Sequence, residues 1–202
     1  MESHDLALTM TGPAREREDS AADSAQALER AMAGDRGAFD ELLRRYERRV
    51  LMTAWRLLGS KEDAQDAAQE VFLRLYRHLH RVDPKRPLSP WFYRMTVNVC
   101  HDLHRRRRWD SVLRVEEVDC ASPDADPAGE FTRAEQKQMI AAALQTLTEK
   151  ERAAVVLRDI QGLSTSEVAG ILGSRETTVR SQISSGRVKI KKFVERLERR
   201  RS

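Results

Sequence analysis

The sequence lacks the features that identify several large classes of protein. It holds two cysteines, Cys100 and Cys120, and no Cys-x-x-Cys pair or His/Cys cluster at metal-ligand spacing, so we expect no structural zinc site. No apolar run is long enough to cross a membrane, and the N-terminus has no signal-peptide core. Because free thiols suit a reducing compartment, we expect a soluble protein of the cytoplasm.

Sequence patterns of catalytic sites are missing as well. We find no nucleophile–base pair, no metal-ligand spacing and no glycine-rich phosphate loop. His101 and His104 could bind a metal ion together with Cys100, although polar residues on a nucleic-acid surface would show the same pattern. Neither these histidines nor His78 and His80 complete a catalytic arrangement. We therefore expect no enzymatic activity, no cofactor and no resident metal.

Charge is abundant but unevenly distributed along the chain. Of the 202 residues 34% are charged, above the roughly 25% of an average globular protein, yet the formal net charge is only +4. Arginines cluster in residues 44–49, 105–108 and 196–201, whereas residues 116–130 are acidic. Basic clusters of this kind favour a protein that meets polyanions at selected faces.

Apolar residues recur at intervals of three and four along most of the chain, and no stretch alternates convincingly with a period of two. We therefore predict an all-α fold of two small helical domains. The predicted organisation is a flexible tail over residues 1–23, a four-helix domain over 24–108, an acidic linker over 109–130 and a second helical domain over 131–202.

Hydroxyl side chains and glycines mark the predicted ends of the helices. Three predicted starts combine a hydroxyl with an acid three residues later, which is the pattern of a capping box. Three others have a hydroxyl alone. The former lie at Ser60, Thr148 and Ser164, the latter at Ser24, Ser89 and Ser174, and glycine ends are predicted at Gly59, Gly162 and Gly173.

The stretch over residues 89–108 has two faces when it is read at helical spacing. Arginines neutralise phosphates, amides hydrogen-bond base edges and aromatic rings stack on exposed bases, so its polar face could meet nucleic acid. An amphipathic core helix with a solvated basic end would look similar. The apolar face holds Phe92, Met95, Val99 and Leu103, and the polar face holds Arg94, Asn98, His101, Asp102 and Arg105, with Trp91 and Tyr93 near the start.

A short capped helix, a glycine turn and a longer helix follow one another from residue 164, which is the pattern of a helix-turn-helix. In that motif the first turns of the second helix enter the major groove. Here those turns are small, polar or basic, as contacts to base edges and phosphates require, so DNA binding is favoured over a plain helical hairpin. The exposed positions are predicted to be Arg175, Thr177, Thr178, Arg180, Ser181, Gln182, Ser184, Ser185 and Arg187.

Four stretches that contain these features follow one another along the chain: GDRGAFDELLRRYERRV, LLGSKEDAQDAAQEVFLRLYRHL, PWFYRMTVNVCHDLHRRRR and residues 147–192. They closely resemble the bacterial RNA polymerase sigma factors of the extracytoplasmic-function (ECF) type, over nearly all of residues 24–192. The segment DAQDAAQEVFLRLY, residues 63–76, is the most specific part. The helix-turn-helix by itself is less specific, because two-component response regulators carry a similar one.

The resemblance implies a transcription initiation factor. The first domain resembles sigma domain two, which binds the clamp helices of the largest polymerase subunit and the minus-ten promoter element, where one base is extruded. The second resembles sigma domain four, which reads the minus-thirty-five element and meets the polymerase flap. The implied polymerase contacts are Asp63, Asp66, Gln69, Glu70, Phe72 and Arg74, the minus-ten contacts are Trp91, Arg94, Asn98, Asp102, Arg105 and Arg106, and the minus-thirty-five contacts are Arg175, Thr178, Arg180, Ser181, Gln182, Ser184, Ser185 and Arg187.

The resemblance also bears on regulation. Members of the family are usually held inactive by an anti-sigma factor that wraps both domains, so such a partner is implied here. The acidic linker stands in place of the third domain of housekeeping sigma factors. It could mimic nucleic acid near the RNA path, or it could be a solvated tether.

The second helix of the helix-turn-helix departs from the usual family pattern at three positions. Gln182 and Ser185 stand where arginines are usual, and Gly186 replaces alanine. Two fewer cations should weaken phosphate binding and its salt dependence. The minus-thirty-five sequence is therefore left open. The alternative function is an autonomous DNA-binding regulator that uses only this motif.

Overall fold

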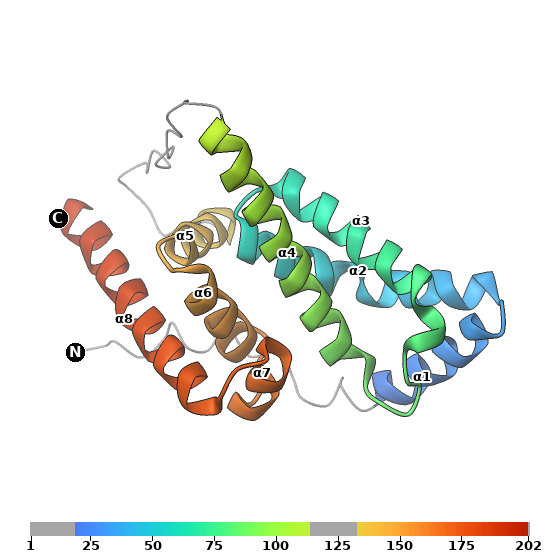
Figure 1. The fold of residues 1–202 in the computed structure, drawn as a ribbon. Coiled ribbons are helices and arrows are strands. Elements are labelled where there is room, and N and C mark those ends of the chain that lie inside the picture. Colours follow the sequence, from blue (N-terminus) through green and yellow to red (C-terminus); the bar gives the residue numbers. More distant parts are fainter. Residues whose placement is uncertain (1–18, 114–132, 202) are drawn as a thin grey trace.

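The computed structural model describes residues 19–113 and 133–201, and Figure 1 shows its fold. Within these ranges every regular element is a helix, so the predicted all-α fold is confirmed. Of the predicted tail (1–23) and linker (109–130), residues 1–18 and 114–130 lie outside the described residues. The helices are α1 (Asp19–Met32), α2 (Arg36–Leu58), α3 (Lys61–Arg77), α4 (Leu88–Leu113), α5 (Arg133–Gln145), α6 (Glu149–Val155), α7 (Thr165–Leu172) and α8 (Glu176–Arg201), with a 3₁₀ turn η2 (Leu79–Arg81) and a π turn η3 (Val156–Ile160). Residues 19–23 and 109–113 were predicted as irregular but belong to helices α1 and α4.

The helix starts predicted from a hydroxyl and an acid are all confirmed. Thr148 and Ser164 each form both hydrogen bonds of a capping box. Ser60 accepts a hydrogen bond from the backbone N–H of Asp63 at 3.2 Å, but the Asp63 carboxylate turns to Arg107 and does not close the box. The predicted glycine ends are confirmed by positive φ angles at Gly59 (78°), Gly162 (68°) and Gly173 (60°).

The three N-caps predicted from a lone serine are wrong. Helix α1 begins before Ser24, which is buried inside the helix and accepts a hydrogen bond from the Tyr46 hydroxyl at 3.1 Å. Helix α4 includes Ser89, whose hydroxyl accepts a hydrogen bond from Arg49 at 2.9 Å. Helix α8 begins only after the residue that follows Ser174. Without an acid to close a capping box, each hydroxyl bonds to whatever partner the packing brings near it.

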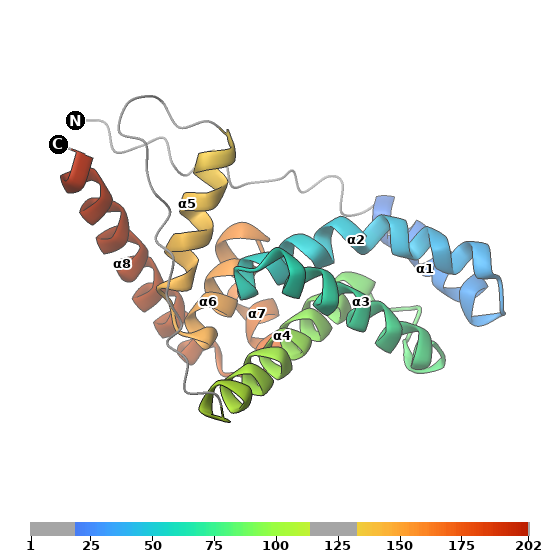
Figure 2. The ribbon, with the colours of Figure 1, turned by 90° about the horizontal axis from the view of Figure 1, so that it is seen from above.

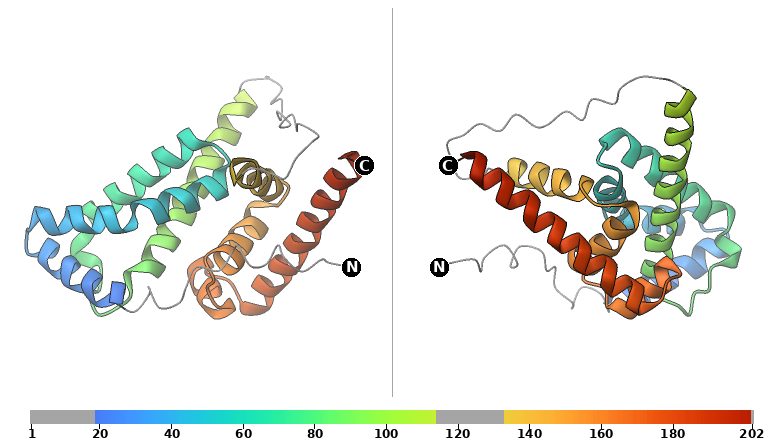
Figure 3. Two further views of the ribbon diagram at one scale, coloured as in Figure 1. Left: turned by 180° about the vertical axis from the view of Figure 1, so that it is seen from behind. Right: turned by 60° about the vertical axis from the view of Figure 1, so that its left-hand side comes forward.

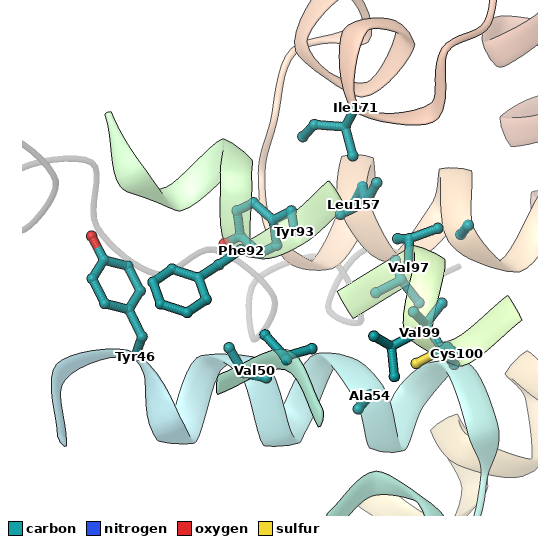
Figure 4. Close-up of a cluster of buried hydrophobic side chains, with 14 of the residues drawn as sticks. Tyr46, Val50, Ala54, Phe92, Tyr93, Val97, Val99, Cys100, Leu157 and Ile171 are labelled. Atoms are coloured by element: carbon teal, nitrogen blue, oxygen red, sulfur yellow. The ribbon is translucent and has the colours of Figure 1, made fainter. Parts of the chain in front are cut away.

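Helices α1 to α4 form the first group, which has an aromatic centre. Tyr46 of α2 stacks on Phe92 of α4 with ring centroids 4.3 Å apart, and Phe72 of α3 meets Phe92 edge-on at 5.7 Å. Val50 and Val99, each 1% exposed, continue this core along α2 and α4 (Figure 4). The apolar face predicted for α4 is thus confirmed at its most buried positions.

Helices α5 to α8 form the second group. Val168 of α7 and Val179 of α8 are fully buried between the two helices of the predicted helix-turn-helix. The sequence pattern did not predict that α6 passes into a π turn after Val155. At Gly186, an added Cβ would lie only 2.7 Å from Cγ2 of Val155, so α8 approaches α6 more closely than a residue with a Cβ permits.

The two groups pack against each other through α4, which contacts α7, and through α2, which contacts α5 and α6. Helix α4 lies between the groups in Figure 1, and the end of α2 lies beside α6 in Figure 2. Val97 of α4 points toward Leu157 and Ile171 of the second group (Figure 4). The buried guanidinium of Arg152 donates a hydrogen bond to the carbonyl oxygen of Leu57, at the end of α2, at 2.5 Å. Helices α1 and α8 lie at opposite ends of the molecule (Figure 3). None of the described helices is both long and apolar enough for a membrane span.

Candidate nucleic-acid interface

Helix α3 has an outward face that mixes polar and apolar side chains. Asp66 and Gln69 are exposed on it, as predicted, and Glu70 lies at its edge. Leu73 and Tyr76 are also exposed, at 41% and 67%. Sequence reasoning missed these two because an apolar residue in an amphipathic helix is first assigned to the core. An acidic face with an adjoining apolar patch is typical of a protein-binding surface.

Three of the six predicted polymerase contacts do not lie on the outward face of α3. Asp63 is 7% exposed and forms an ion pair with Arg107 of α4. Phe72 belongs to the aromatic centre described above. Arg74 lies against α4, where its guanidinium is 3.4 Å from a carboxylate oxygen of Asp102. These side chains fasten α3 to α4, so they support the outward face of α3 from behind.

Helix α4 presents the predicted polar strip in part. Arg94, Asn98, Arg105 and Arg106 are exposed. Asp102, one turn beyond Asn98, is partly exposed and 3.3 Å from Arg105. The strip therefore combines an unburied amide, a carboxylate and several cations along one side of a helix. Such side chains can hydrogen-bond an extruded base and hold the backbone of an unpaired strand. Trp91 is only partly exposed and packs edge-on against its neighbour Phe92.

The second group covers the adjacent side of α4. Arg94 donates a hydrogen bond to the backbone carbonyl of Gly170 in α7. The Tyr93 hydroxyl donates to the side-chain oxygen of Gln161 at 3.0 Å, and Tyr93 is 6% exposed. Burial lowers the pKa of His101, while the nearby carboxylate of Glu149 acts in the opposite direction. The predicted stacking of Tyr93 on nucleic acid is therefore not available in this arrangement.

The cysteine and histidines of α4 do not form a metal site. Cys100 is 1% exposed, and burial, assisted by the charge of Asp63, raises the pKa of its thiol to about 12. Throughout residues 19–113 and 133–201, no three side chains of His, Cys, Asp or Glu are grouped as metal ligands would be. The buried thiol is a small apolar core side chain.

The first turns of α8 are open to solvent. Two of the exposed arginines are oriented by carboxylates: Arg180 lies 3.0 Å from Glu176, and Arg187 makes two bonds to Asp159 at 2.6 and 2.9 Å. Each guanidinium keeps further N–H donors for phosphate or base edges. The exposed side chains on these turns are those of Arg175, Thr177, Thr178, Arg180, Ser181, Ser184, Ser185 and Arg187, together with one acid, Glu176.

A depression of about 390 Å³ lies beside α8. Two of its residues, Arg158 of η3 and Thr165 at the start of α7, were missed by sequence reasoning because they precede the second helix of the motif. Arg158 is oriented by a hydrogen bond to the carbonyl oxygen of Leu163 at 2.8 Å. Cations and hydroxyls around a depression suit a phosphate group. The lining residues are Arg158, Thr165, Arg180, Ile183, Ser184, Arg187 and Val188.

The structure explains the unusual residues of α8. The Ser185 hydroxyl donates to Glu151 of α6 at 2.6 Å, and Lys189 donates to the same carboxylate at 2.7 Å. Burial raises the pKa of Glu151, but the bonds from Lys189, Ser185 and Thr148 outweigh it and lower the pKa to about 2. The hydroxyl of the exposed Ser185 is thus already bonded to a residue of the same domain.

The prediction that Gln182 is exposed is wrong. The side chain is partly buried, and its oxygen accepts no hydrogen bond from any residue that the structure describes. Gln182 flanks the buried positions Val179 and Ile183 on the side of α8 that faces α6. It therefore offers less of its amide to DNA than its exposed neighbour Ser181 does.

Comparison with known proteins places both groups in one family. Residues 42–110 match the family described as Sigma-70 region 2, and residues 137–190 match Sigma-70, region 4. The ECF RNA polymerase sigma factor SigE of Mycolicibacterium smegmatis is 36% identical over 166 residues, covering 80% of this chain and 64% of that protein. SigM of Mycobacterium tuberculosis is 34% identical, with 85% of this chain and 84% of that protein covered. The sigma-H factor of Pseudomonas aeruginosa is 32% identical, with 86% and 95% covered.

Two solved structures have a similar fold. CnrH in complex with the cytosolic domain of CnrY matches 86% of this chain and 97% of that chain, with a TM-score of 0.64 and 24% identity. The sigma factor RpoE of Bartonella quintana, in complex with the anti-sigma factor NepR, matches 78% and 96%, with a TM-score of 0.66 and 18% identity.

Proposed function

The chain belongs to the ECF group of the sigma-70 family, and we propose that it binds core RNA polymerase, directs it to specific promoters and assists melting of the minus-ten region. The observation that carries this proposal is the combination, in one chain, of an outward protein-binding face on α3, an amide-bearing basic strip on α4 and an exposed second helix in a helix-turn-helix. A regulator that only binds duplex DNA needs the last of these alone. The proposal includes no chemistry on a substrate and no cofactor, and it places the protein in the cytoplasm with the polymerase.

The polymerase surface is proposed to be the outward face of α3. Its charged and amide groups come from Asp66, Gln69 and Glu70. Its apolar area, which is exposed to water in the isolated chain, comes from Leu73 and Tyr76. Buried apolar contacts surrounded by polar ones give stable protein interfaces, and complementary charge speeds their formation. Asp63 and Phe72 act from behind this face by fixing α3 on α4, and Arg74 lies between the two helices, where it pairs with Glu70 and Asp102.

The minus-ten surface is proposed to be the strip on α4. Asn98 reads an extruded base through its amide, while Arg94, Arg105 and Arg106 hold the phosphates of the unpaired strand. Asp102 lies beside the base, and Trp91 flanks the strip. Because one N–H of the exposed Arg94 is bonded to Gly170 here, movement of α7 away from α4 would release that donor as well.

The minus-thirty-five surface is proposed to be the start of α8. Thr178, Ser181 and Ser184 face the base edges, and Arg175, Arg180 and Arg187 bind phosphates. Since Ser185 is bonded to Glu151 and Gln182 is partly buried, both contribute less than their positions in the sequence suggested.

Control by an anti-sigma factor is also part of the proposal. The two similar structures described above are both complexes, one of which is named as a sigma factor with its anti-sigma factor. The side of α4 that faces the second group and the exposed apolar residues of α3 are surfaces that such a partner could cover.

The test is run-off transcription with purified core polymerase on promoters selected from a genomic or random library. Promoter-specific transcripts that require this protein are the expected result. Absence of transcripts, with duplex binding by the protein alone, would instead support the autonomous regulator.

Two substitutions test the proposed polymerase and minus-ten surfaces independently. Asp66→Lys should weaken binding to core polymerase, whereas Glu47→Lys, the same charge change at an exposed position of α2, should not. Asn98→Ala should reduce open-complex formation and leave core binding intact. Unchanged open-complex formation in that variant would show that the base-reading role is misassigned.

A further inference from the structure

The facing edges of α3 and α4 hold a chain of charged groups, which we call the α3–α4 seam: Glu70, Arg74, Asp102 and Arg105. The Arg74 guanidinium donates to Glu70 through Nε at 2.7 Å and reaches Asp102 through Nη2 at 3.4 Å. Arg105 binds the other oxygen of Asp102 at 3.3 Å. Arg74 is therefore shared between carboxylates of two different helices, and these carboxylates raise its pKa.

The two carboxylates belong to different proposed surfaces. Glu70 stands at the edge of the outward face of α3, where a cationic group of polymerase could reach it. Asp102 lies one helical turn from Asn98, on the strip proposed to hold the minus-ten base. Arg74 thus connects a carboxylate beside the polymerase to one beside the DNA through a single side chain.

Asp102 needs a cation because its charge repels the phosphates that the same strip must attract. Arg105 is 75% exposed and can turn toward the DNA, which would remove it from Asp102. Arg74 is only 26% exposed and lies across α4 beside Met95, with Nη1 at 4.0 Å from the sulfur. It is placed to keep Asp102 neutralised while the strand is bound.

We propose that Arg74 is a positioning residue that couples polymerase binding at Glu70 to the state of Asp102 beside the minus-ten pocket. When a cation of polymerase pairs with Glu70, Arg74 is released to bind Asp102 more fully, which frees Arg105 for a phosphate. This inference rests on the proposed function, since it joins two of its surfaces. By linkage, Arg74 and the polymerase compete for Glu70.

A second ion pair between α3 and α4, outside the seam, supplies a control. Asp63 and Arg107 form an ion pair between the same two helices. This pair lies closer to the C-terminal end of α4 than Asn98 does. If Arg74 merely fastens α3 to α4, the effects of Arg74→Met and Arg107→Met should be alike. If Arg74 couples the surfaces, only its replacement should change core binding and promoter opening in opposite directions.

The experiment compares Arg74→Met, Asp102→Asn, the double variant and Arg107→Met in the full chain, with core polymerase and a selected promoter. Arg74→Met should tighten core binding, because Glu70 is released, and should lower open-complex formation about threefold, the scale of one partly exposed ion pair. Adding Asp102→Asn should restore opening, because a neutral amide needs no counter-cation. Arg107→Met should show neither tighter core binding nor rescue by Asp102→Asn.

Weaker core binding in Arg74→Met, or additive losses in the double variant, would overturn the coupling and leave Arg74 as a fastening between helices. This failure is distinct from failure of the proposed function. If the proposed function were wrong, the unaltered protein would itself support no promoter-specific transcription. If only the coupling were wrong, the unaltered protein would be active, and only the effects of the Arg74 and Asp102 variants would depart from those expected.

Discussion

The two helices proposed to read DNA are held in different ways. Helix α8 is fastened to α6 by a buried carboxylate, Glu151, that bonds three neighbours, and by a backbone approach that only Gly186 allows. Helix α4 is fastened to α3 partly through Arg74 and Asp102, which are 26% and 37% exposed. A duplex can be read by a helix that does not move, whereas an extruded base requires charges that can exchange partners. The difference suits a rigid reader of duplex DNA and an adjustable reader of the melted strand.

The two helices also differ in what covers them. The exposed turns of α8 face solvent, but α4 has Tyr93 and Arg94 bonded to residues of the second group. The packing of the two groups therefore covers part of the proposed minus-ten strip and leaves the helix-turn-helix accessible. Promoter opening, more than duplex binding, should depend on separating the groups.

The largest effect is expected at the buried carboxylate of α6. Glu151→Gln should lower the free energy of unfolding by about 3 kcal/mol at pH 7, because it removes the charge that Lys189 and Ser185 bind. Glu176→Gln, at an exposed pair with Arg180, should cost less than about 1 kcal/mol. Urea denaturation of both variants measures this. Equal losses would remove the contrast between rigid and adjustable fastening.

The pH dependence of the free energy of unfolding is a second measure of the stabilisation by Glu151. The folded pKa of Glu151 is about 2, below the ordinary 4.5, so its stabilisation is complete above the unfolded pKa and is lost as the pH falls through 4.5 toward 2. The unaltered protein should therefore lose more stability between pH 6 and pH 3 than Glu151→Gln does, by about 2 kcal/mol. Parallel acid profiles of the two proteins would contradict the depressed pKa.

A smaller effect is expected at the close contact of α8 with α6. Gly186→Val should destabilise the protein by about 2 kcal/mol, because its Cβ would overlap the Val155 methyl group. Gly170→Val is the matched control, since a Cβ at Gly170 meets nothing within 4 Å. Thermal unfolding of the pair checks the prediction. A similar Tm for both variants would mean that α8 can shift on α6.

The smallest effect is expected where the two groups meet. Gln161 accepts a hydrogen bond from Tyr93 and donates one to Thr53 of α2 at 3.1 Å. Gln161→Ala should cost about 1 kcal/mol and separate the groups in part of the population, raising the radius of gyration in solution scattering at unchanged helix content. Gln138→Ala, at an exposed position of α5, should leave the radius unchanged. An unchanged radius in Gln161→Ala would show that apolar packing alone holds the groups together.

Much of the candidate site was predictable because helical spacing places side chains on faces. The exposure of Asp66, Gln69 and Asn98 and most of the exposed turns of α8 follow from that spacing alone. The errors have a common origin in contacts from outside the helix concerned. Asp63 was predicted to face a partner, but its pairing with Arg107 depends on the antiparallel packing of α4.

The sequence by itself determined the helices, two capping boxes, the glycine ends and the family, because these depend on residues within one turn of each other or on long ordered motifs. Only the tertiary structure decided where a helix buries a second face in addition to its apolar stripe. Tyr93 and Val97 are buried on α4, although a single amphipathic stripe predicts one buried side. That second face packs against residues more than sixty positions later in the chain, such as Gln161, and short-range periodicity carries no information about such distant partners.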